Sequence, residues 1–406
     1  MEIRLLTFIL LMMIPVLSCQ PLAGPAGAAG IKGSFGYDRA FIRAHDPGAI
    51  VLGEGSAQII VSPKYQAKVL TSTTEGDTGL SFGWIHYKAF EGPVDPHMNA
   101  YGGENRLWLG PEGGRFSLFF QKDAKMEFAN WKTPAVFDTE PWQLAAHTSS
   151  AVTLHKDMAL VNYAGTSLSL NIDRMIMLLS PQAIDSLLGL PADASVAAVG
   201  YQTDNKLTNT GGTAWDDQTG MPCIWMLDMF PPSDRTTIVM PYVKDSADTK
   251  PATTDYFGEI PADRIRMDGQ TLFFKADGKS RGKLGIHPGR AKNIAGSYDA
   301  LHHVLTLIIF DVQGSALYLN QEWNKTKPPF SGDAVNAYND GPLAGGGQLG
   351  PFYELESVSP AAFLKPGQSL THRHSVFHFT GDEGALDRIA QETLKVSLDQ
   401  IKSALK

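Results

Sequence analysis

The sequence predicts an all-β protein, built as one large sandwich of antiparallel sheets with short helices near its ends. Its 406 residues include 40 glycines and 25 prolines, and 10% are aromatic, a balance typical of turn-rich β-architecture. Short apolar runs recur between turn residues along most of the chain. No repeat of fixed period is present, so neither a propeller nor a solenoid is expected. No linker-like segment follows residue 37, so we expect one domain over residues 37–406.

Helices are predicted near both ends of this domain and strands between them. Residues 37–45 carry apolar side chains at helical spacing, and 180–188 read as a short helical excursion. Apolar residues from 386 to 405 recur at three- and four-residue steps, which predicts one broken helix or two short ones with Ser397 as a cap. The other runs predict strands at 57–61, 67–71, 83–88, 151–155, 159–162, 167–172, 175–179, 199–209, 223–229, 236–241, 271–275, 282–287, 301–310, 316–322, 352–357 and 372–379.

The first 18 residues read as an export signal. Arg4 provides a minimal positive start, and the apolar run from Leu5 to Leu17 is too short to span a membrane. Residues 16–19 resemble a bacterial lipobox, which predicts that Cys19 carries a lipid and that the protein lies in the cell envelope, as a periplasmic or outer-membrane lipoprotein. Residues 19–36 are rich in Gly, Ala and Pro and predict a flexible tether. Cys223 is the other cysteine, so a Cys19–Cys223 disulfide is the alternative.

Charge and motifs exclude several classes of function. The net charge is −8 and there is no basic stripe, so no nucleic-acid partner is expected. The chain has no H-E-x-x-H, no phosphate-binding Gly-rich loop and no paired C-x-x-C. Residues 278–282 match G-x-S-x-G, but a strand rather than a helix is predicted after them, so we interpret them as a charged hairpin turn.

The stretch from His97 to Phe120 concentrates polar residues in and beside two Gly-rich turns and predicts a hairpin-like strand pair. Such polar groups are costly to bury without partners, and a hydroxyl-rich ligand would supply them. The alternative is an ion pair between Arg106 and Glu112 that fixes the turn. The candidate residues of this stretch are His97, Asn99, Asn105, Arg106 and Glu112.

A second polar cluster lies in the Gly-rich segment 332–350, which reads as a loop. Its Asp333, Asn336, Asn339 and Asp340 could surround a sugar or bind calcium through oxygen atoms. The segment lacks the spacing of an EF-hand, and a plain surface loop is the alternative.

Two further clusters lie on late predicted strands. Glu354 and Glu356 are two residues apart and so face one side of a sheet, where their repulsion should raise the pKa of one of them toward a value useful for acid or base catalysis. A solvated outer face is the alternative. His372, His374 and His378 also share one face, which suggests either a zinc site or, more simply, a solvent-facing side of the sheet.

Taken together, these motifs resemble the galactose mutarotase-like superfamily, the aldose 1-epimerase β-supersandwich. Within it, the sequence is most similar to a group of uncharacterised bacterial lipoproteins. The resemblance extends over about residues 50–379. It is carried by Ile60-Val61-Ser62-Pro63 with Val69-Leu70-Thr71-Ser72, Gly102-Gly103 with Asn105-Arg106-Leu107-Trp108, Leu207-Thr208-Asn209-Thr210-Gly211, and Tyr353 to Glu356 followed by Leu364-Lys365-Pro366-Gly367.

The resemblance implies a sugar site on a concave sheet face, with no cofactor beyond the calcium alternative. It makes Glu356 the candidate base, with Glu354 second, and His97 a candidate catalytic partner. Trp108 and Trp225 could stack on a sugar ring or belong to the core.

This sequence has no histidine at the positions that correspond to the catalytic histidines of the family. The position before the Gly-Gly pair is Tyr101, and no histidine occurs between His155 and His287. Two hypotheses therefore remain: a sugar epimerase, isomerase or lyase that uses Glu356 with His97 or a tyrosine, and a non-catalytic glycan-binding lipoprotein. The sequence does not predict an oligomeric state.

Overall fold

The computed structural model describes residues 30–53, 55–191, 193–245, 249–343 and 345–405. The predicted export signal, the lipid-bearing Cys19 and the tether up to residue 29 lie outside the described residues. The first helix, α1 (Phe35–His45), begins two residues before its predicted start at residue 37 and so includes the last two residues of the predicted tether. The reason is local: the Ser34 hydroxyl caps the helix by accepting from the Tyr37 amide, and Phe35 is fully buried.

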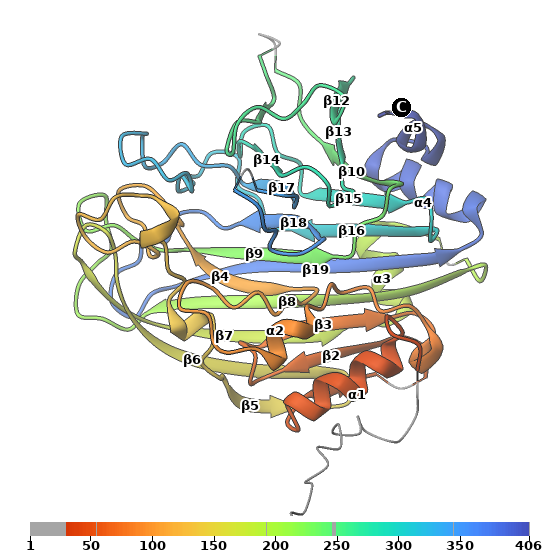
Figure 1. Ribbon diagram of the computed structural model, residues 1–406, viewed down its shortest axis with the longest axis horizontal. Helices are drawn as coiled ribbons and strands as arrows, with labels where there is room; N and C mark the ends of the chain where they lie inside the picture. The colour runs from red at the N-terminus through yellow and green to blue at the C-terminus, as the bar shows by residue number, and fades with distance from the viewer. Residues whose placement is uncertain (1–29, 54, 192, 246–248, 344, 406) are drawn as a thin grey trace, which may run out of the picture.

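One layer of the fold is a ten-stranded sheet in which every pair of neighbours is antiparallel (Figure 1). Its long central strands pair over most of their length, as β19 and β8 do from Ser369–Thr208 to Gly381–Val196. The strand order is β12 (Ile265–Asp268), β13 (Thr271–Lys275), β10 (Thr236–Pro241), β15 (Ile294–Asp299), β16 (Val304–Phe310), β19 (Ser369–Gly381), β8 (Val196–Asn209), β7 (Ser167–Leu178), β6 (Ala151–Val161) and β5 (Gln143–His147).

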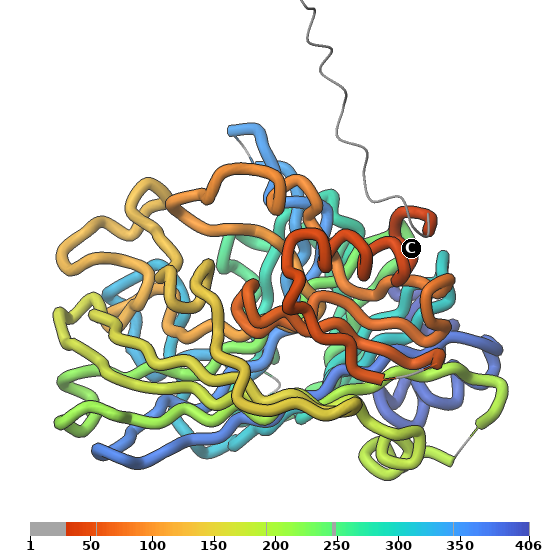
Figure 2. The backbone as a smooth tube through the Cα atoms, turned by 90° about the horizontal axis from the view of Figure 1, so that it is seen from below, coloured from red at the N-terminus to blue at the C-terminus, as the bar shows by residue number. Residues whose placement is uncertain are grey.

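The second layer is made of two smaller sheets that a single bridge between Val69 and Asn105 joins side by side. Figure 2 shows the N-terminal part of this layer lying across the long strands of the first. The six-stranded sheet has the order β11 (Ala252–Thr253), β14 (Gly282–Ile286), β17 (Val335–Asn339), β18 (Tyr353–Val358), β9 (Cys223–Phe230) and β4 (Arg106–Gly110), and the three-stranded sheet has the order β1 (Ile50–Leu52), β2 (Gln58–Ser62) and β3 (Lys68–Thr73). The predicted all-β sandwich is thus confirmed.

Helices cover the outer faces of these layers. α3 (Pro181–Leu188), α4 (Glu383–Leu394) and α5 (Leu398–Ser403) pack their apolar sides on the outer face of the ten-stranded sheet. The C-terminal segment was predicted as one broken helix or two short ones, and the structure shows two short helices, with Ser397 in a capping box with Gln400. α1 covers the three-stranded sheet, and the short pieces are α2 (Tyr87–Glu91), η1 (Gly76–Thr78), η2 (Phe128–Asn130) and η3 (Ala135–Phe137). No helix in the described part of the chain is both long enough and apolar enough to cross a membrane.

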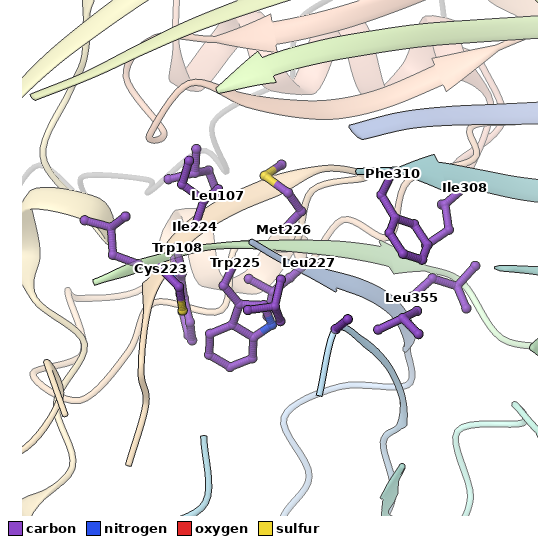
Figure 3. Packing of buried hydrophobic residues seen from close by; sticks show 14 of the residues in the cluster. Leu107, Trp108, Cys223, Ile224, Trp225, Met226, Leu227, Ile308, Phe310 and Leu355 are labelled. Carbon is purple, nitrogen blue, oxygen red and sulfur yellow. The ribbon is translucent and has the colours of Figure 1, made fainter. Parts of the chain in front are cut away.

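Alternation along the six-stranded sheet separates the core from the opposite face. Leu107, Met226 and Leu355 point between the layers, where the main hydrophobic core lies. Figure 3 shows Leu107 and Met226 on one side of the strands and Trp225 on the other. Because side chains alternate along a strand, Trp108, Trp225 and both late glutamates share the face that points away from the ten-stranded sheet.

A seam of buried polar groups lies between the two layers. The Nε2 of His374 is 2.6 Å from Asp228 Oδ2, and its Nδ1 is 2.8 Å from the Ser357 hydroxyl, which also contacts His372 at 2.8 Å. These distances match a Ser-His-Asp triad, but all four residues are at most 1% exposed, so no substrate reaches them and the network is structural.

The three histidines were predicted to face solvent or to hold zinc, and both interpretations are wrong. The three histidines lie on the inner face of the ten-stranded sheet, which the second layer covers, so they do not meet water. His378 instead lies against Glu104 Oε1 at 3.0 Å and Thr306 Oγ1 at 2.9 Å. The described residues contain no group of three or more histidine, cysteine or acidic side chains placed to hold a metal ion.

Several predicted elements take another form. Residues 111–142 contain no strand, so the predicted hairpin is absent and β4 pairs with β9 instead. The segments 83–88 and 316–322 were predicted as strands, but neither forms one. Each contains a single isolated β-bridge, at Ile85 just before α2 and at Tyr318. The predicted loop 332–350 contains β17, an interior strand. The predicted charged hairpin at 278–282 connects β13 and β14, which belong to different sheets.

Candidate functional site

A small cavity opens on the face of the six-stranded sheet that points away from the core. Its volume is about 110 Å³, below the 300–1,000 Å³ of typical small-molecule sites. The strands β4, β9, β14, β17 and β18 form its floor. Residues from the segments 98–100, 112–131, 257, 281, 323 and 349–352 form its walls. The lining residues are Met98, Ala100, Arg106, Trp108, Glu112, Phe128, Trp131, Trp225, Leu227, Met229, Phe257, Arg281, Lys283, Trp323, Tyr338, Leu349, Phe352 and Glu354.

Four tryptophans make the cavity strongly aromatic. Trp108 and Trp225 are cross-strand neighbours with ring centroids 5.7 Å apart, and Trp131 and Trp323 stack at 6.0 Å on the wall. Trp131 belongs to the segment 111–142, whose aromatic side chains fold over the sheet. The indole N–H groups of Trp108 and Trp131 are buried and have no acceptor in the described protein. The cavity therefore presents aromatic side chains to a ligand.

Two ion pairs cross the floor of the cavity. Arg106 Nη2 is 3.0 Å from Glu354 Oε1, and Lys283 Nζ is 2.8 Å from Glu356 Oε2. Glu356 Oε2 also accepts from the Trp225 indole N–H at 2.8 Å. Arg106 does not pair with Glu112, so the alternative of an Arg106–Glu112 turn is not what the structure shows.

The two late glutamates lie on one face of β18 as predicted, but they differ in exposure. Glu354 lines the cavity, whereas Glu356 is 0% exposed beneath Lys283 and Trp225, and its Oε1 has no partner. Burial raises the pKa of Glu354 to about 8, helped by the neighbouring Glu356 and opposed by Arg106 and Lys283. Glu354 is therefore the carboxyl that can exchange a proton with a ligand near neutral pH.

A second carboxyl and a second network complete the cavity. Burial also raises the pKa of Glu112, against the influence of Lys283. On the other wall, Arg281 Nε donates to the Tyr338 hydroxyl at 3.2 Å, and that hydroxyl donates to Asp340 Oδ1 at 2.7 Å. Asp340 therefore holds the Tyr338 hydroxyl in place and does not itself line the cavity.

Of the residues singled out from the sequence, five come together in the cavity. They are Arg106, Trp108, Glu112, Trp225 and Glu354.

The other candidate residues lie elsewhere. Asn105 is buried between the layers, where it donates to Asp228 Oδ1 at 2.6 Å and accepts from Arg174. Asn339 accepts from the Gly278 amide and donates to the Ser280 carbonyl, so it shapes a turn. Neither side chain reaches the cavity.

His97 and Asn99 also lie outside the cavity. The His97 ring stacks on Phe128 with centroids 5.0 Å apart, and Phe128 rather than His97 lines the wall. Asn99 binds Asp138 Oδ2 at 2.8 Å behind the same wall. Asp333 accepts from the Tyr256 hydroxyl at 2.7 Å, and burial raises the pKa of Asp333 to about 6.

The structure adds lining residues that the sequence did not single out, chiefly Lys283, Arg281, Tyr338 and Trp131. Arg281 and Lys283 are two apart at the start of β14, so their shared face could have been read from the sequence. Their partners are distant: Lys283 meets Glu356 across 73 positions, through the neighbouring strand β17. Only the order of strands in the sheet brings these groups together.

Solved structures of galactose mutarotase-like proteins are similar to this chain. A putative aldose 1-epimerase of Escherichia coli K12 is 14% identical, with a TM-score of 0.45 over 81% of this chain and 98% of that one. A galactose mutarotase-like protein of Lactobacillus casei is 11% identical, with a TM-score of 0.47 over 82% and 100%. A Synechocystis protein is 12% identical, with a TM-score of 0.47 over 82% and 96%.

At the level of sequence, one family model matches residues 33–405, and it describes a family of unknown function (DUF6786). The match covers nearly the whole described chain. No curated protein matches the sequence.

Proposed function

The chain belongs to DUF6786, a family of unknown function, and we propose that its cavity binds a sugar and transfers protons at the sugar's anomeric centre. The observation that carries this proposal is Glu354, a carboxyl group with its pKa raised to about 8 on the wall of an aromatic cavity. A general base works best when its pKa lies near the working pH. Glu354 thus replaces Glu356 as the proposed base, because Glu356 is fully buried and occupied by Lys283 and Trp225.

The aromatic and acidic residues that line the cavity support the proposed binding of a sugar. The negative face of an aromatic ring attracts the partly positive C–H groups of a sugar. Trp108 and Trp131 provide such rings, and the carboxyls of Glu112 and Glu354 accept from hydroxyls. The small volume suits one ring of a ligand, with the remainder extending out of the cavity.

The chemical part needs one base and one acid. Glu354, once deprotonated, takes the proton of the anomeric hydroxyl, and the ring oxygen takes a proton as the ring opens. Glu112 provides a second carboxyl in the same cavity whose pKa is raised by burial, so that it can hold the proton to be donated. Closure of the ring with the opposite configuration reverses both transfers.

A non-catalytic glycan-binding protein is the second candidate. Two observations favour it: Arg106 and Lys283 each hold a late glutamate in an ion pair, and none of the described residues that line the cavity is a histidine. Such a protein would bind the same sugars without changing them.

Sugar binding is tested by tryptophan fluorescence, because four tryptophans line the cavity. We expect D-glucose or D-galactose to change the emission saturably in the wild type. Trp108→Leu should weaken that binding by roughly tenfold, since ring contacts contribute ~0.5–1.5 kcal/mol beyond their area. Trp142→Leu is the control, because Trp142 is equally buried but does not line the cavity. No saturable change with any hexose would contradict the proposal.

We further propose that Cys19 carries a lipid and anchors the protein to the cell envelope, as the motif at residues 16–19 indicates. Cys19→Ala should then move the protein from the membrane fraction to the soluble fraction when cells are fractionated. A variant that stays entirely with the membranes would refute lipid attachment at this residue.

A further inference from the structure

Arg281 is held rigidly at the edge of the cavity. Its guanidinium carbon lies 3.7 Å from the centroid of the Phe257 ring, and its Nε donates to the Tyr338 hydroxyl at 3.2 Å. Tyr338 is in turn fixed by Asp340, so two aromatic side chains set the plane of the guanidinium. A planar group held this way loses little side-chain entropy when it binds a ligand.

Arg281 makes no ion pair with any residue that the structure describes. The other two lining cations, Arg106 and Lys283, have carboxylate partners at 3.0 and 2.8 Å. Within the described residues, Arg281 has no carboxylate within ion-pair distance, and no acceptor is found for its two η-amino groups. Those groups are therefore free to bind an anion at the cavity.

We propose that the sugar bound here carries an anionic group, a carboxylate or a phosphate, and that Arg281 binds it. This inference rests on the proposed sugar site and specifies its substrate class. A guanidinium matches the two oxygens of a carboxylate or phosphate with paired hydrogen bonds, which gives both affinity and orientation. The sugar ring then lies over the tryptophans, with its charged substituent directed toward Phe257.

The position of Arg281 fits a substituent on the ring rather than the reacting centre. Phe257 is 43% exposed, so the guanidinium stacked on it lies toward solvent. Glu354 lies on β18 and Arg281 precedes β14, with β17 between those two strands. One end of the ligand thus meets Glu354 while the other meets Arg281, which orients the ring.

The test compares three sugars by calorimetric titration: D-glucose, D-glucuronate and D-glucose 6-phosphate. We expect at least one anionic sugar to bind the wild type about tenfold or more tightly than D-glucose. Arg281→Gln should remove that advantage, so that the anionic sugar binds no more tightly than D-glucose. Arg266→Gln is the matched control, because Arg266 is an exposed arginine on the edge strand β12, and it should behave as the wild type.

Each outcome decides the inference. Preference for glucuronate identifies a carboxylate, and preference for the phosphate ester identifies a phosphate. Equal binding of charged and neutral sugars, or an advantage that survives Arg281→Gln, overturns the inference and leaves the sugar site standing. Binding of sodium sulfate through Arg281 without binding of any sugar overturns both this inference and the proposed function.

Discussion

Replacing Glu354 with Gln is expected to lower sugar turnover by about 10²–10⁴-fold, the usual contribution of a general base. The fold should persist, because glutamine has nearly the same shape and volume as glutamate. The amide oxygen can still accept from Arg106. Turnover and urea-induced unfolding of the same sample separate the two effects.

The pH dependence of turnover also tests whether Glu354 is the general base. A base must be deprotonated to act, so wild-type kcat/KM should rise with pH and level off above about 8, the pKa of Glu354. The residual activity of Glu354→Gln should lack that rise. Glu392→Gln is the control, because Glu392 is exposed on α4, outside the ten-stranded sheet. Full activity in Glu354→Gln would show that another group is the base.

Replacing Lys283 with Met is expected to destabilise the fold by about 3–5 kcal/mol, because it leaves a buried carboxylate without its cation. The side chains of Glu356 and Lys283 are 0% and 6% exposed, so water cannot replace the lost partner. Removing both charges together, in Lys283→Met with Glu356→Leu, should recover most of the loss. Urea unfolding of the two single variants and the double variant completes a double-mutant cycle.

An exposed ion pair serves as the control for this cycle. Lys279 and Asp234 are 2.5 Å apart, but their side chains are 62% and 70% exposed. Lys279→Met should therefore leave the unfolding curve unchanged. If Lys283→Met were equally silent, the Lys283–Glu356 pair would not hold β14 and β18 in place.

Local patterns in the sequence predict much of the fold and part of the site. Two-residue alternation places Glu354 and Glu356 on one face of a strand, and three- and four-residue steps give the C-terminal helices with the Ser397 cap. These features depend on neighbours in the chain. The raised pKa of one glutamate was predicted from the repulsion of two carboxylates on one face, but burial is its largest cause and the neighbouring Glu356 adds to it.

The features that the sequence could not predict depend on contacts between strands that are far apart in the chain. Alternation says which residues share a face, but not whether that face meets water, so His372 and His374 were expected outside although they lie between the layers. The same alternation does not say which of Glu354 and Glu356 a neighbouring strand will cover. Lys283 covers Glu356, and that contact depends on the order of β14, β17 and β18 in the sheet.

The segment 111–142 shows a different limit. Its aromatic run at Phe116, Leu118 and Phe120 has the period of a strand, yet the chain there is irregular. The run starts after Gly113 and Gly114, and its side chains are buried in the core without a partner strand. Burial of these apolar side chains accounts for the alternation, and single backbone hydrogen bonds, such as those from Tyr163 to Ser117 and from Lys132 to Phe119, stand where a strand ladder was expected.

The most direct test of the proposed activity is anomer exchange followed by NMR. D-glucose, D-galactose and D-glucuronate are each brought to equilibrium at pH 8, and magnetisation transfer between the α and β anomers is measured with and without protein. Wild-type protein should accelerate exchange of at least one sugar, and the acceleration should be lost in Glu354→Gln but kept in Glu392→Gln. Exchange at the uncatalysed rate with a sugar that demonstrably binds would contradict the account and leave a glycan-binding protein.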